Sequence, residues 1–157
     1  MRVHLLAVGG ITEPGLKAAS DMYERRVRHY FKLDVREVTA GGRGGRDPRK
    51  TLEAEAAALE AVVPDGCDVV ALTRAGKGMS SRRLAMYLEE LGTYGREGVA
   101  FVIGGAEGLA VRLLETARYR LSLSPMTLSH DLARVVLLEQ LYRAGTIMRG
   151  EPYHRGP

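Results

Sequence analysis

The sequence predicts an α/β protein with a mostly parallel β-sheet and helices on both faces. Short apolar runs such as Val3–Val8 and Val99–Ile103 are typical of strands buried on both faces. Between such runs lie longer stretches with apolar residues at three- and four-residue spacing, which predicts amphipathic helices. Strands and helices alternate along the whole chain, and this alternation indicates the fold class. A chain of 157 residues fits one domain, so we expect 1–157 to form a single domain.

The first half of the chain begins with a buried strand and contains one strand of a different character. Leu33–Val38 alternates apolar and charged residues, which indicates a strand near a sheet edge. Asp47 followed by Pro48 is typical of a helix start, with an N-cap and then proline. The elements expected here are a strand at Val3–Val8, a helix from Pro14 to about Phe31, a strand at Leu33–Val38, a basic glycine-rich loop at 41–46, a helix from Pro48 to about Val63 and a strand at Asp68–Thr73.

The second half continues the alternation and places three loops where ligands bind. The elements expected here are a loop at Ala75–Gly78, a helix from Ser80 or Ser81 to about Leu91, a strand at Val99–Ile103, a short helix at Leu109–Thr116, a strand at Tyr119–Leu123, a loop at Ser124–Ser129 and a helix from His130 to about Ile147. In open parallel sheets, ligands bind at the carboxyl ends of the strands. We therefore look for chemistry in the loops that follow Thr73, Ile103 and Leu123.

Composition narrows the class of protein. The net charge of +4 favours a polyanionic partner such as nucleic acid, although many basic proteins bind none. No apolar run approaches the roughly 18 residues that a membrane span needs. The single cysteine, Cys67, cannot form an internal disulfide, which fits a reducing cytosol. It opens a strand-like run, so we interpret it as a small buried side chain rather than a nucleophile.

Two of these loops could hold a ligand. Gly104, Gly105 and Gly108 follow a buried strand, where glycines allow either a tight turn alone or close approach of the backbone to a ligand. Their spacing does not match a dinucleotide-binding motif, and a Walker-type phosphate loop is missing. The segment 121–130 is rich in small and apolar residues. It could present backbone groups and apolar side chains to a flat ring such as adenine, or serve only as a packed connection.

The C-terminal helix and tail carry the remaining candidates. The helix from His130 is apolar on more than one face, which suggests contact with the sheet on one side and another subunit on the other. His130 and Arg134 at its start are either polar groups of a site, or a cap and a salt bridge. In the tail, Tyr153, His154 and Arg155 could stack on a base and hold its oxygens. A solvated chain end is the alternative.

Taken together and in this order, these motifs identify a family. The chain resembles the RlmH family, the ribosomal RNA large-subunit pseudouridine N3-methyltransferases of the SPOUT class. Ala106 and Ser129 stand where the family usually has proline. The resemblance covers nearly the whole chain and includes Gly9, the glycine loop 41–45, Leu72 with Gly76-Lys77, Ile103-Gly104-Gly105 with Glu107-Gly108-Leu109, Leu121–Ser124 with Met126–Leu128 and His130, Arg134 with 139–144, and Pro152-Tyr153-His154-Arg155.

The resemblance implies a fold and a cofactor that residue spacing does not. The fold would be an α/β knot, with the C-terminal part forming a trefoil knot. S-adenosyl-L-methionine would lie in that knot. The residues that would hold it are Leu72, Gly104, Leu123, Ser124, Pro125, Met126, Thr127 and Leu128. The protein would be a cytoplasmic homodimer in which the partner's tail helps to complete each site.

The same resemblance implies a substrate and a reaction. The substrate would be pseudouridine 1915 in helix 69 of 23S ribosomal RNA, at the subunit interface of the assembled ribosome. Methylation at N3 requires loss of the N3 proton, and cationic groups would stabilise the resulting anion. Arg134, His154 and Arg155 are candidates for that role, and His130 or His154 for the proton acceptor. Tyr142 or Tyr153 would orient the base. No metal is required.

Two rival interpretations belong to other classes of protein. One is a non-enzymatic ribosome-binding factor that uses the same basic surface, and it would not bind S-adenosylmethionine. The other is a nucleotide-dependent α/β enzyme that acts on small molecules. The spacing of the glycines and the missing phosphate loop count against the second.

Overall fold

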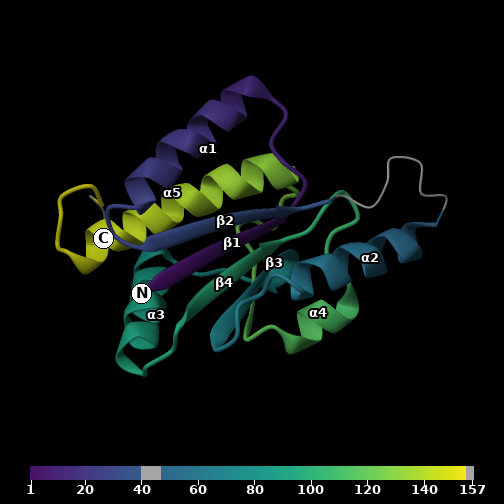
Figure 1. Ribbon diagram of the computed structural model, residues 1–157. Coiled ribbons are helices and arrows are strands. Elements are labelled where there is room, and N and C mark those ends of the chain that lie inside the picture. The colour runs from purple at the N-terminus through teal and green to yellow at the C-terminus, as the bar shows by residue number, and fades with distance from the viewer. Residues whose placement is uncertain (40–46, 155–157) are drawn as a thin grey trace.

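The computed structural model describes residues 1–39 and 47–154, in which strands and helices follow the predicted order (Figure 1). The elements are β1 (Arg2–Val8), α1 (Pro14–Val27), β2 (Lys32–Val38), α2 (Pro48–Glu60), β3 (Cys67–Lys77), α3 (Ser81–Thr93), β4 (Gly98–Ile103), α4 (Val111–Thr116), β5 (Tyr119–Leu121) and α5 (His130–Met148). Every strand pairing is parallel, in the order β2-β1-β4-β3-β5. The α/β class and the parallel sheet are thus confirmed, whereas the knot stays a prediction. The loop predicted at 41–46 lies outside the described residues.

Each face of the sheet has its own hydrophobic core. Alternate residues of β1 and β4 point to opposite faces, as the two-residue period of a strand requires. Leu5 and Phe101 pack with α1, α3 and α5, and both side chains are fully buried. Leu6 and Val102 pack with α2 and α4 on the other face. Figure 1 shows α1 and α5 on one side of the sheet and α2 and α4 on the other. The prediction of helices on both faces is therefore confirmed.

Helix α5 lies between α1 and α3, and this position explains its apolar character. Leu137, Leu138 and Leu141 are fully buried in the core shared by α1, α3 and the sheet. The predicted contact with the sheet is confirmed, and the two neighbouring helices take up further apolar surface. Contact with another subunit stays a prediction. A Cβ on Gly145 would lie 2.4 Å from Cγ of Tyr30, so only glycine lets Tyr30, in the turn after α1, pack this closely on α5.

The loop predicted at Ala75–Gly78 is wrong, because β3 continues to Lys77. The register of β3 against β5 shifts between Leu72 and Lys77, and Lys77 then pairs with Leu121. A Cβ on Gly76 would lie only 2.4 Å from the carbonyl oxygen of Arg120. The glycine that indicated a loop is therefore present because two strand backbones approach closely.

Some element boundaries also differ from the predictions. Helix α1 ends at Val27 rather than near Phe31, because the N–H of Tyr30 bonds the carbonyl of Val27 in a tighter turn. Strand β5 ends at Leu121 rather than Leu123, and the Ser122 hydroxyl then bonds the carbonyl of Ser124 within a turn. Helix α2 ends at Glu60, and α4 begins at Val111.

Residues 1–39 and 47–154 contain neither a membrane-spanning helix nor a cluster of metal-ligating side chains. No helix there is both long enough and apolar enough to cross a membrane. No group of three or more His, Cys, Asp or Glu side chains in that part of the chain is arranged to hold a metal ion.

Candidate active site

A cavity of about 260 Å³ lies at the carboxyl ends of β3, β4 and β5. The loops that follow β4 and β5 meet there against Leu72–Arg74 of β3, close to where the rule for parallel sheets predicts a ligand site. Its walls are apolar side chains, glycine backbone and a few polar groups. The lining residues are Leu72, Thr73, Arg74, Ile103, Gly104, Gly105, Ala106, Gly108, Leu109, Leu121, Leu123, Ser124, Met126, Thr127, Leu128, His130 and Ala133. All the residues predicted to hold the cofactor line this cavity except Pro125, which is exposed beside it.

The glycine loop is built around its own backbone. A Cβ on Gly104 would lie 2.2 Å from the carbonyl oxygen of Gly108, so the turn itself requires glycine at position 104. Gly105 and Gly108 form a bridge, and Gly108 has a φ of +80°, which favours glycine. This loop therefore both makes a tight turn and lines the cavity. The sequence alone had left these two roles open as alternatives.

Hydroxyl groups fix the loop between β5 and α5. The Ser122 hydroxyl donates to the carbonyl of Ser124 at 2.9 Å, and the N–H of Met126 donates to the Ser124 hydroxyl at 3.0 Å. Ser129 caps α5 by accepting the N–H of Leu132 at 3.3 Å, so serine at this position starts the helix. Met126 is 76% exposed, which shows that the middle of this loop is not a connection packed in the core.

Arg74 is a cavity residue that the sequence reasoning missed. It is exposed, and its Nη1 donates to the Thr127 hydroxyl oxygen at 3.1 Å, so it links β3 to the loop after β5. No Asp or Glu is among the described residues that line the cavity. The available signal was its position, because Arg74 directly follows Thr73, where the sequence predicted the end of a strand and a ligand-binding loop.

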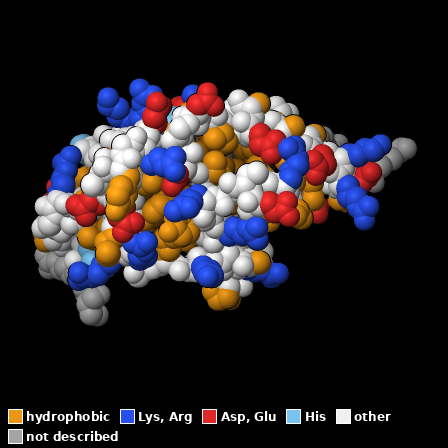
Figure 2. Space-filling view, turned by 90° about the horizontal axis from the view of Figure 1, so that it is seen from below, with side chains coloured by type: hydrophobic (Ala, Val, Ile, Leu, Met, Phe, Trp, Pro, Cys, Tyr) orange, Lys and Arg blue, Asp and Glu red, His pale blue; other side chains and the backbone are white. Residues whose placement is uncertain are grey.

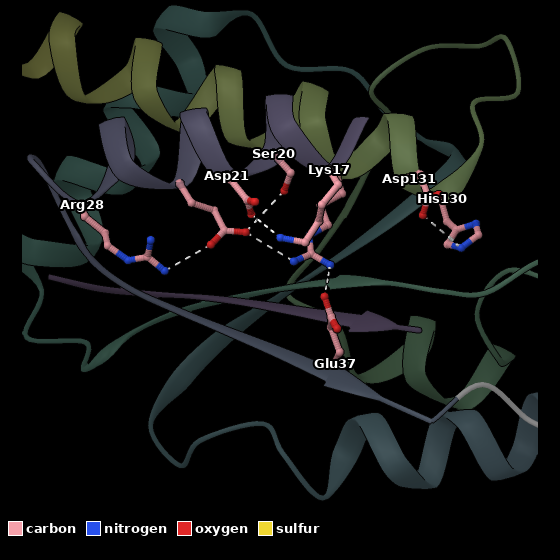
Figure 3. Close-up of polar contacts among 9 residues, drawn as sticks. Lys17, Ser20, Asp21, Arg28, Glu37, His130 and Asp131 are labelled. Atoms are coloured by element: carbon pink, nitrogen blue, oxygen red, sulfur yellow. Dashed lines mark hydrogen bonds and ion pairs between the residues drawn. The ribbon is translucent and has the colours of Figure 1, made fainter. Parts of the chain in front are cut away.

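His130 and Arg134 lie in different environments although they are one helical turn apart. His130 lines the cavity, and its Nε2 lies 3.3 Å from Oδ1 of Asp131 (Figure 3). Arg134 does not line the cavity and is only 4% exposed. Its Nη1 lies 2.6 Å from Oε1 of Glu37, and its Nη2 lies 3.3 Å from Oε1 of Glu24. The salt bridge foreseen as the alternative role of Arg134 is present.

These charges belong to an ionic cluster that joins α1, α5 and β2. We define the ionic cluster as Ser20, Glu24, Arg28, Glu37 and Arg134. Glu24 also accepts the Ser20 hydroxyl at 3.3 Å and Nη2 of Arg28 at 3.2 Å. Figure 3 shows Glu37 pointing from β2 toward the helices, and Ser20 and Arg28 reaching from α1. Two carboxylates from distant parts of the chain therefore bind the buried Arg134 guanidinium through its Nη1 and Nη2.

The tail packs on its own helix through a tyrosine cluster, which we define as Tyr23, Tyr30, Tyr142 and Tyr153. The Tyr142 ring centroid lies 4.6 Å from that of Tyr153, 5.8 Å from that of Tyr30 and 6.4 Å from that of Tyr23. The Tyr153 hydroxyl donates to Oε1 of Glu139 at 3.1 Å. Up to His154 the tail is thus not a solvated chain end, while Arg155 lies outside the described residues.

His154 lines a second cavity, which has a volume of about 530 Å³. This cavity also contacts Ser81 at the start of α3 and Gln140 on α5, and it shares Leu121 and Leu123 with the first cavity. Within one chain, the residues predicted to act on the substrate therefore lie at different places. His130 lies at the first cavity and His154 at the second, Arg134 lies in the ionic cluster, and Tyr142 and Tyr153 lie in the tyrosine cluster.

Comparison with known proteins identifies the family. The family described as "Predicted SPOUT methyltransferase" matches residues 1–154. The chain belongs to the SPOUT methyltransferase family. A protein from Gemmatimonas aurantiaca named ribosomal RNA large subunit methyltransferase H is 47% identical over 99% of this chain and 100% of its own length. A protein of the same name from Clostridium novyi is 40% identical with the same coverage. The resemblance to the RlmH family is thus confirmed.

Solved structures support the fold of this SPOUT methyltransferase. A probable methylase family protein from Haemophilus influenzae superposes with a TM-score of 0.56 and 14% identity, over 98% of this chain and 70% of that one. A probable methyltransferase from Bordetella pertussis gives a TM-score of 0.53 and 19% identity, over 91% of this chain and 95% of that one. At these identities the likeness concerns the fold alone.

The tyrosine cluster predicts a loss of stability in alkali. Burial, with hydrogen bonds to Glu151 and Glu139 respectively, raises the pKa of Tyr30 and the pKa of Tyr153 to about 12. The unfolded chain releases phenolic protons at about pH 10. Because the folded pKa is the higher one, the stabilisation is complete below about pH 10 and is lost as the pH rises towards 12.

Denaturant unfolding at a series of alkaline pH values, with phenolate absorbance of the seven tyrosines, measures this loss. The free energy of unfolding should fall over that interval in the wild type and fall less steeply in Tyr153→Phe. A wild-type protein whose tyrosines all ionise at about pH 10 without loss of stability would contradict the prediction.

Proposed function

We propose that this SPOUT methyltransferase uses S-adenosyl-L-methionine to methylate large-subunit ribosomal RNA, at N3 of pseudouridine 1915 in helix 69 of the assembled ribosome. The main support is the cavity at the carboxyl ends of β3, β4 and β5, in a chain whose full-length relatives carry the name ribosomal RNA large subunit methyltransferase H. We propose further that the enzyme is a single-domain, cytoplasmic homodimer. The sharing of each site between two subunits is part of this proposal.

The residues of the first cavity fit the cofactor. Leu72, Leu123 and Leu128 offer apolar surface to a flat, uncharged adenine ring. The glycine loop at 104–105 lets backbone groups approach it, and the Ser124 and Thr127 hydroxyls add hydrogen-bonding groups. We assign Leu72, Gly104 and the stretch from Leu123 through Leu128 to the binding of S-adenosylmethionine.

The cofactor supplies a methyl group on a positively charged sulfur, and the protein must promote the loss of the proton from N3 of the pseudouridine. His130 lines the first cavity, so it is the histidine of the same chain that lies nearest to the chemistry we propose. Histidine titrates near neutral pH and suits proton transfer. We propose that Tyr153, His154 and Arg155 of a partner subunit's tail approach this cavity. The Tyr153 ring would stack on the base, and a cationic side chain of His154 or Arg155 would stabilise the N3 anion.

Arg134 and Tyr142 are assigned a different role from the one the sequence suggested. Arg134 is engaged by Glu24 and Glu37, and Tyr142 is enclosed by other aromatic rings. We propose that both act as positioning residues. Arg134 fixes the start of α5, which carries His130, and Tyr142 supports the tail residue Tyr153.

Surface charge alone does not define where RNA would bind. On the face shown in Figure 2, basic side chains are interspersed with acidic ones and form no continuous basic surface. The net charge of +4 is correspondingly modest. We therefore expect a substantial part of the specificity to come from shape and from contacts to unpaired bases.

The proposed function is tested by methyl transfer from labelled S-adenosylmethionine. Purified protein is incubated separately with whole ribosomes, large subunits and protein-free 23S RNA from cells that lack the enzyme, and the labelled nucleotide is mapped. We expect label at N3 of one pseudouridine in helix 69, with whole ribosomes as the best substrate. Cofactor binding with label at another nucleotide would overturn the assigned target. Ribosome binding with no cofactor binding would indicate a non-enzymatic factor.

A further inference from the structure

The first cavity has an uneven distribution of charge. Apolar side chains of β3, β4 and β5 line it, among them Leu72, Ile103 and Leu121, whereas Arg74, two residues after Leu72 in β3, is exposed. The other ionisable side chain on the cavity wall is His130, and no carboxylate lines the described part of it. A guanidinium held beside a cavity without acidic residues favours a ligand with a negatively charged group.

Thr127 fixes the position of Arg74 but accepts only one of the hydrogen bonds that the guanidinium can donate. Its Nη1 donates to the Thr127 hydroxyl at 3.1 Å, and no ion pair with a carboxylate is found for it among the described residues. A guanidinium has five N–H donors in a planar fork that matches the geometry of a carboxylate. One hydrogen bond to a hydroxyl therefore orients the group without neutralising it.

We propose that Arg74 binds the carboxylate of the methionyl group of the cofactor, an inference that rests on the proposed function. Adenine and ribose are uncharged, so the carboxylate is the one anionic group that S-adenosylmethionine offers. With the adenine ring against the apolar walls, the charged methionyl end is placed toward the polar pair Arg74 and Thr127, both of which line the cavity and are exposed. Arg74 also bonds Thr127, so carboxylate binding draws the loop after β5 and β3 to the same ligand.

The test compares two ligands that differ only in this carboxylate. Isothermal titration calorimetry on the full chain measures the dissociation constants of S-adenosylmethionine and of its decarboxylated analogue. The variants are Arg74→Gln, Arg74→Lys and, as a matched control, Arg118→Gln, which removes an exposed arginine that does not line the cavity. A charge-assisted hydrogen bond at a partly exposed site is expected to give wild type about a ten-fold preference for the carboxylated ligand.

Arg74→Gln should bind both ligands with nearly equal affinity, because it weakens only the carboxylated one. Arg74→Lys should keep part of the preference, and Arg118→Gln should keep all of it. If Arg74→Gln weakens both ligands equally, Arg74 only holds the loop through Thr127, and the inference is wrong. If both affinities are unchanged, Arg74 does not contact the ligand, which also overturns it. If wild type binds neither ligand, the proposed function itself fails.

Discussion

Replacing Arg134 with alanine is expected to lower the free energy of unfolding by about 3–5 kcal/mol, because removal of one partner leaves buried carboxylate charge uncompensated. Glu24 is only 9% exposed and would retain Arg28 and Ser20, whereas the side chain of Glu37 is 42% exposed and can take up water. The larger part of the loss therefore comes from Glu24. Denaturant unfolding of wild type and variant measures the difference.

Two further variants separate buried charge from other causes. Arg36→Ala removes an exposed arginine whose partner, Asp34, has a half-exposed side chain, so it should cost less than about 1 kcal/mol. Adding Glu24→Gln to Arg134→Ala removes the stranded charge and should recover at least about 1 kcal/mol. If Arg134→Ala is instead as stable as wild type but inactive with normal cofactor affinity, Arg134 acts on the substrate and the positioning role is wrong.

Deletion of Tyr153–Pro157 is expected to abolish methyl transfer to ribosomes and to leave cofactor affinity within a few-fold of wild type. The tail packs on α5 through Tyr142 and Glu139, and neither residue lines the first cavity. Methyl transfer with labelled cofactor and calorimetry on the same preparation measure the two quantities. A truncated enzyme that methylates ribosomes at the normal rate would show that the tail is not part of the site.

Mixing two inactive variants tests whether the tail acts on a partner subunit. The tail-deleted chain is combined with full-length Gly104→Val, in which a side chain would collide with the carbonyl of Gly108 and distort the cofactor cavity. In a randomly assembled dimer with shared sites, about a quarter of all sites contain one intact cavity and one intact tail. Activity should return to about that fraction of wild type. A mixture that stays inactive, although mixed dimers form, means that each tail serves its own chain.

The sequence was informative wherever local signals and global packing agree. The apolar runs of β1 and β4 are buried on both faces, so composition alone located them within a residue. Asp47 with Pro48 and Ser80 marked helix starts that the structure confirms. The Gly76 segment misled because a glycine can indicate either a loop or close packing of two strands. The distinction depends on Arg120, which lies far along the chain.

The candidate site, too, could be predicted in part from the sequence. The loops after β4 and β5 could be predicted as walls of the first cavity, since parallel strands end at one edge of the sheet. The third wall, Leu72–Arg74, lies within β3, where the sequence predicted that the strand ends at Thr73. The partners of Arg134 could not be predicted, because Glu24 and Glu37 lie 110 and 97 residues away in sequence. The packing of Tyr153 on Tyr142 was also beyond reach, since a short tail carries no periodic signal. The ring, imidazole and guanidinium of Tyr153, His154 and Arg155 left a solvated end open as an alternative, and the resemblance to the RlmH family implied that the tail has a function.

The order of strands in the sheet has a consequence for how the chain is made. Strand β1 can pair with β2 soon after synthesis begins, but its other neighbour is β4, and residues 2–7 pair with 98–103. At about 5–20 residues per second, a ribosome needs roughly 5–20 s to add the intervening chain. Throughout that interval the other edge of β1, with Leu5 and Leu6, has no partner. Substitutions that make this edge more apolar should therefore lower the yield of folded protein during translation, even where the finished enzyme is equally stable.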